Sequence, residues 1–73
     1  MLQKGLELRY QSQIEVAKSA IHVLVHHATA VAEHDTAKLV DDLDAQLHII
    51  ADCKDKLDVL ESLKDAFTHV DRT

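Results

Sequence analysis

The stretch YQSQIEVAKSAIHVLVHHATAV, residues 10–31, decides the fold. Its apolar side chains recur at alternating steps of four and three residues, whereas a half-buried strand would alternate apolar and polar residues. This spacing predicts a helix with a coiled-coil-like seam that packs against a second helix. The seam residues in this half of the chain are Tyr10, Ile14, Ala17, Ile21, Leu24, Ala28 and Val31.

The second half of the chain repeats the pattern. A broad apolar stripe runs from Leu39 to Val70, and an acidic face lies opposite it, which is typical of an amphipathic helix. The chain contains no proline, and Gly5 is its only glycine, so no strong helix breaker follows residue 5. The residues expected to face the first helix are Leu43, Leu47, Ile50, Leu57 and Leu60.

The segment EHDTAK, residues 33–38, is the best candidate for a turn, because Asp35 or Thr36 can cap the second helix. We therefore expect an all-α protein, an antiparallel two-helix hairpin that forms a single domain over residues 1–73. The expected bounds are about 6–33 for the first helix, about 34–36 for the turn and about 37–70 for the second helix. One continuous helix is the alternative.

The size and charge of the chain limit the classes of function that it can have. With 73 residues and one cysteine, Cys53, the chain has no internal disulfide to support a thin core, so a second chain is the expected support. A net charge of −5 without a basic run argues against nucleic acid as the ligand. No apolar run is long enough to span a membrane, and no secretory signal is evident. We expect a cytoplasmic protein.

A second apolar row accompanies the seam of the first helix. A hairpin partner can cover only one seam, and an exposed apolar strip usually marks an interaction surface. The row therefore predicts a docking site for another protein, while homodimerisation into a four-helix bundle would bury the same residues. The expected partner-binding residues are Val16, Ala20, Val23, Val25, His27 and Ala30.

The histidines raise a metal hypothesis. His22 and His26 are four residues apart on the polar side of the helix, a spacing that can chelate one ion. The glutamate that would follow the first histidine in a zinc-protease helix is replaced by Val23, and a third ligand would have to be His34, Glu33 or a residue of a partner. Solvated, neutral histidines are the favoured interpretation. We expect no metal, no cofactor and no catalytic residue, and we interpret Cys53 as a small core residue.

Three segments together resemble the YscE-like family, the small co-chaperones of type III secretion needle subunits. They are SQIEVAKSAIHVL in the first helix, AEHDTAKL at the turn and LHIIADCKDKLDVLESLKDAF in the second helix. The resemblance implies a non-enzymatic hairpin that stabilises a larger tetratricopeptide-like chaperone in the bacterial cytoplasm. The pair would keep the needle subunit unpolymerised, with the first helix as the docking element.

Overall fold

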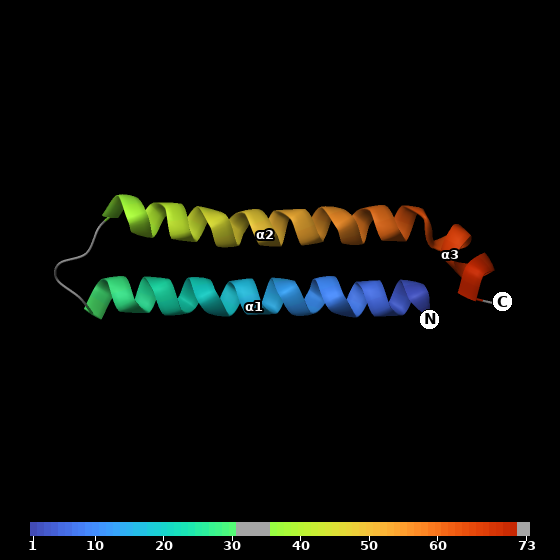
Figure 1. Ribbon diagram of the computed structural model, residues 1–73, viewed down its shortest axis with the longest axis horizontal. Helices are drawn as coiled ribbons and strands as arrows, with labels where there is room; N and C mark the ends of the chain where they lie inside the picture. The colour runs from blue at the N-terminus through green and yellow to red at the C-terminus, as the bar shows by residue number, and fades with distance from the viewer. Residues whose placement is uncertain (31–35, 72–73) are drawn as a thin grey trace.

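The computed structural model describes residues 1–30 and 36–71 and shows an all-α hairpin. Helix α1 spans Leu2–Ala30, α2 spans Thr36–Ser62 and α3 spans Lys64–Asp71. Helices α1 and α2 run antiparallel, side by side along their length, and α3 lies beside the N-terminal end of α1 (Figure 1). The fold class predicted from the periodicity is therefore confirmed, and a single continuous helix is excluded.

The helix bounds differ from the expected ones at several points. Helix α1 begins at Leu2, four residues before the expected start, because Gly5 does not break it: the Gly5 amide donates to the Met1 carbonyl at 3.0 Å. Thr36 is already part of α2. Residues 31–35, which include Val31, the expected end of the first helix and the possible cap Asp35, lie outside the described residues.

The expectation of one helix over residues 37–70 is wrong at Leu63. The Ser62 hydroxyl donates to the Val59 carbonyl at 2.7 Å, a local bond that competes with the helix ladder and bends helices. The Leu63 amide accordingly splits its bond between the Val59 and Leu60 carbonyls, both at 3.1 Å. The chain changes direction here (Figure 1), and α3, which includes half-buried Phe67, contacts α1.

The core between the two long helices is thin. Among the described side chains, the buried ones are Ile14, Ala17, Cys53 and Leu60. Tyr10, Ile21, Leu24 and Ala28 are half-buried on the α1 side, as are Leu43, Ile50 and Leu57 on the α2 side. The structure thus places these seam residues in or beside the interface.

Leu47 is the exception to the expected seam. Its side chain is 55% exposed, and the neighbouring Gln46 is half-buried in its place. The reason is the spacing: a helix turns 100° per residue, so Gln46, three residues after Leu43 and four before Ile50, lies closer to the direction of α1 than Leu47 does. The contact residues of α2 follow alternating steps of four and three through Leu39, Leu43, Gln46, Ile50, Cys53, Leu57 and Leu60.

Candidate protein-interaction surface

The second apolar row of α1 is largely uncovered. Val16 and Val23 are each 67% exposed, and Ala20 between them is half-buried. These residues follow each other at steps of four and three, so they share one flank of α1 beside the seam. Ala17 on the seam is only 1% exposed, which shows that α2 covers the seam and leaves the adjacent row open.

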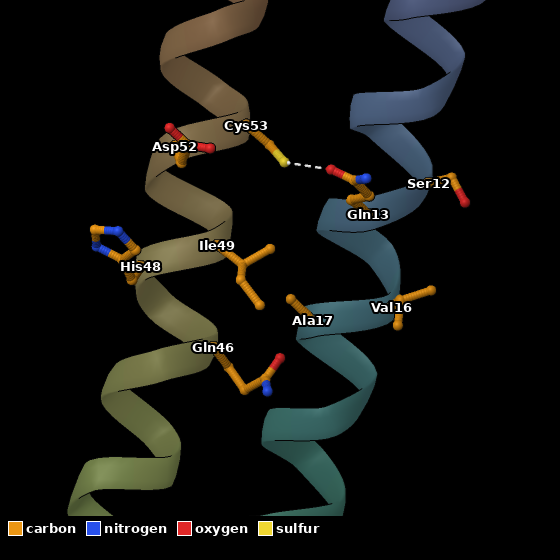
Figure 2. Close-up of a pocket in the computed structure, with 9 residues that line it drawn as sticks. All are labelled: Ser12, Gln13, Val16, Ala17, Gln46, His48, Ile49, Asp52 and Cys53. Atoms are coloured by element: carbon orange, nitrogen blue, oxygen red, sulfur yellow. Dashed lines mark hydrogen bonds between the residues drawn. The ribbon is translucent and has the colours of Figure 1, made fainter.

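Helix α2 extends this row into a groove between the helices. Val16 and Ala17 of α1 line it together with Ile49 and Cys53 of α2, and its volume is about 430 Å³. Figure 2 shows Ala17 and Ile49 pointing toward one another, with Val16 on the outer side of α1. The exposed fraction of Ile49 is 39%, so the groove has apolar walls on both sides.

A second groove of about 390 Å³ continues the first. Ala20 and Val23 line it from α1 and Ala45 lines it from α2, while Gln46 borders both grooves. The two hollows therefore lie on one side of the hairpin and form a single strip. We call this strip the groove face and define it by five apolar residues that lie outside the seam, namely Val16, Ala20, Val23, Ala45 and Ile49.

The structure separates the residues that were expected to bind a partner. Val25 is 46% exposed, but it lies two residues, or 200°, from Val23 and therefore on the opposite flank of α1. His27 is exposed on the flank of the groove face, and Ala30 is the last residue of α1. Val16, Ala20 and Val23 come together on one surface, and Val25 does not join them.

Acidic side chains edge the groove face along α2. Asp42 accepts from Lys38 at 3.2 Å and Asp52 accepts from Lys56 at 3.0 Å, both as exposed pairs one helical turn apart. The hydrogen bond to Asp52 is the main reason that the pKa of Lys56 lies above its ordinary value. Exposed pairs of this kind contribute little to folding, so these carboxylates can interact with an incoming chain.

Lys56 and Cys53 also fix how the two helices are aligned. The Lys56 ammonium lies 5.3 Å from the centre of the Tyr10 ring, within the range of a cation–π contact. Cys53 Sγ donates to Gln13 Oε1 at 3.2 Å. Sequence reasoning missed both contacts, because a heptad pattern gives the face of each helix but not its alignment with the other.

The histidines of α1 form no recognisable metal centre. His22, His26 and His27 border a shallow depression of about 590 Å³ with Val23. Across residues 1–30 and 36–71, no three ligand-type side chains come together in a way that could hold a metal ion. His34, the third ligand considered from the sequence, lies outside the described residues.

Cys53 is 2% exposed and bonded to Gln13, as expected for a core residue. His48, its nearest histidine in sequence, points to the outer side of α2 and away from the thiol (Figure 2). The two side chains therefore do not form a nucleophile and base pair.

The comparisons with known proteins identify no relative. No family model, curated protein or solved structure matches this chain. Among the residues that the structure describes, no helical segment combines the length and hydropathy that a bilayer crossing requires.

Proposed function

We propose that the chain is a non-enzymatic, protein-binding hairpin that uses the groove face to hold a helix of another protein. The observation that carries the proposal is the exposure of Val16 and Val23 beside a fully covered Ala17. Apolar surface removed from water stabilises an assembly by about 25 cal/mol per Å². A chain with so few buried side chains gains from covering this strip.

The shape of the groove face favours a helix as the bound element. The strip lies between two helices that run side by side (Figure 1), and it has small side chains at Ala20 and Ala45 that allow close approach. An amphipathic helix laid in such a groove anchors its apolar residues at steps of three and four. The acidic edge formed by Asp42 and Asp52 favours basic residues along one side of that helix.

The resemblance to the YscE-like family gives the proposal a specific form. The hairpin would pair with a larger tetratricopeptide-like chaperone in the bacterial cytoplasm, and the pair would keep a needle subunit unpolymerised until export. The segment SQIEVAKSAIHVL, on which the resemblance partly rests, contains Val16, Ala20 and Val23. In this form the protein stabilises its larger partner and performs no chemistry.

Co-expression with the larger chaperone of the same host tests this function. Val23→Glu places a charge in the groove face, and we expect it to abolish the complex while circular dichroism shows an unchanged helix content. Val40→Glu is the matched control, because Val40 is similarly exposed, at 56%, but lies outside the groove face. A complex that survives Val23→Glu unchanged would show that the partner binds elsewhere.

A further inference from the structure

The two long helices differ strongly in charge. Helix α1 carries three basic and two acidic side chains, a net charge of +1, and also His22, His26 and His27. Helix α2 carries three lysines against seven acidic side chains, a net charge of −4. On the groove face this difference comes from α2, because Asp42 and Asp52 border the grooves while the α1 residues that line them are uncharged.

We propose that, without another partner, a second copy of this chain covers the groove face, with α1 of each copy lying over α2 of the other. The twofold axis then runs parallel to the helices, and the two Ala30–Thr36 ends lie at the same end of the assembly. This inference goes beyond the proposed function, since it concerns the chain alone. Its failure would leave binding to another protein untouched.

The alignment of the helices brings matching residues together in this arrangement. The Gln13–Cys53 and Tyr10–Lys56 contacts fix which residues of α1 lie opposite which residues of α2 along the helix axis. A twofold axis parallel to the helices keeps each copy of α1 at its own level, so Val16 of one copy lies at the level of Ile49 in the other. By the same alignment, Val23 meets the Ala45 region.

The other antiparallel arrangement lacks this complementarity. A twofold axis perpendicular to the helices would stack α1 on α1 and α2 on α2. Two helices of net charge −4 would then face each other, and such juxtaposition of like charges disfavours association. Charge therefore selects the arrangement with α1 over α2.

The available area is sufficient for a stable dimer. The Cα atoms of the described hairpin extend over 57 × 15 × 11 Å, so its broad face measures 57 by 15 Å. The broad faces of two copies together amount to roughly 1,700 Å², so the roughly 1,000 Å² that a specific interface needs is reached when the contact extends beyond the grooves along more than half of the rod. Each copy would also bury its two most exposed groove valines, Val16 and Val23.

Sedimentation equilibrium of the full chain tests the occupant of the groove face. We expect a dimer of 8.2 kDa chains at micromolar concentration. The dimer of the Val16→Glu variant should dissociate at least tenfold more readily than that of Val16→Lys, because residue 16 faces an acidic helix. Val40→Glu should dimerise like the wild type. A monomeric wild-type chain, or equal effects of the two charges at residue 16, would overturn the proposal.

Spin labels test the arrangement. In a Cys53→Ala chain that still dimerises, a label at Ala37→Cys reports the end near Thr36, and a label at Ala51→Cys reports the middle as a control. We expect short label-to-label distances at both sites. If the two labels at residue 51 are close but the two labels at residue 37 are separated by nearly the length of the hairpin, the Ala30–Thr36 ends lie at opposite ends of the dimer. That result would overturn the arrangement.

Discussion

Cys53 donates its thiol hydrogen to the Gln13 side chain across the hairpin, with 3.2 Å between Sγ and Oε1. The thiol is buried, whereas Gln13 is exposed at the edge of the groove face. This contact joins residues 40 positions apart in the sequence and aligns α1 with α2.

Alanine substitutions of Cys53 and of Gln13 separate the contribution of core packing to stability from that of the hydrogen bond. Cys53→Ala opens a void in a thin core, and we expect it to reduce the free energy of unfolding by about 1–2 kcal/mol. Gln13→Ala removes a weak bond at the surface and should cost less than about 0.5 kcal/mol. Urea unfolding at one fixed protein concentration measures both, and equal losses would contradict the placement of Cys53 in the core.

Gly5 lies inside α1 with no steric need for glycine. An added Cβ would meet no atom within 4 Å, so Gly5→Ala should raise the free energy of unfolding by about 0.5–1 kcal/mol through helix propensity and lower unfolded-state entropy. Thermal unfolding followed by circular dichroism checks this value. A destabilised Gly5→Ala variant would indicate that α1 does not continue through residue 5.

Leu43 and Leu47 are one turn apart on α2 but differ in their environment. Leu43 is half-buried toward α1, and Leu47 is 55% exposed. We expect Leu43→Ala to cost about 1–2 kcal/mol and Leu47→Ala less than about 0.5 kcal/mol. Urea unfolding of the two variants gives the comparison, and a larger loss at residue 47 would restore the seam expected from the sequence.

The sequence predicted the hairpin because the α1 seam is unbroken from Tyr10 to Ala28. The predicted seam of α2 was wrong at one residue, because Leu47 was chosen for its hydrophobicity. A strict alternation of four- and three-residue steps from Leu39 to Cys53 selects Gln46 instead. The break at Leu63 adjoins a bond from the Ser62 hydroxyl to the Val59 carbonyl, which no apolar pattern reveals. The groove face required three-dimensional information, because two of its five defining apolar residues, Ala45 and Ile49, come from the other helix.

Asp52 controls the protonation of Lys56. Their 3.0 Å contact raises the pKa of Lys56 above 10.5, so the contact supports folding below that pH and is lost as the pH rises through the folded-state pKa. Asp52→Asn should lower the pKa of Lys56, measured by carbon NMR of its side chain. Asp44→Asn is the control and should leave it unchanged; an equal drop in both variants would contradict a specific pair.

The groove face is tested most directly by the solvent accessibility of its valine methyl groups, measured by NMR with a soluble paramagnetic probe. In the dilute, monomeric chain we expect strong broadening of Val16, Val23 and the reference Val40, all of which are more than half exposed. In a dimer or partner complex, Val16 and Val23 should become protected while Val40 remains broadened. Protection of Val16 and Val23 in a demonstrated monomer, or full broadening of both in every assembly, would contradict the account.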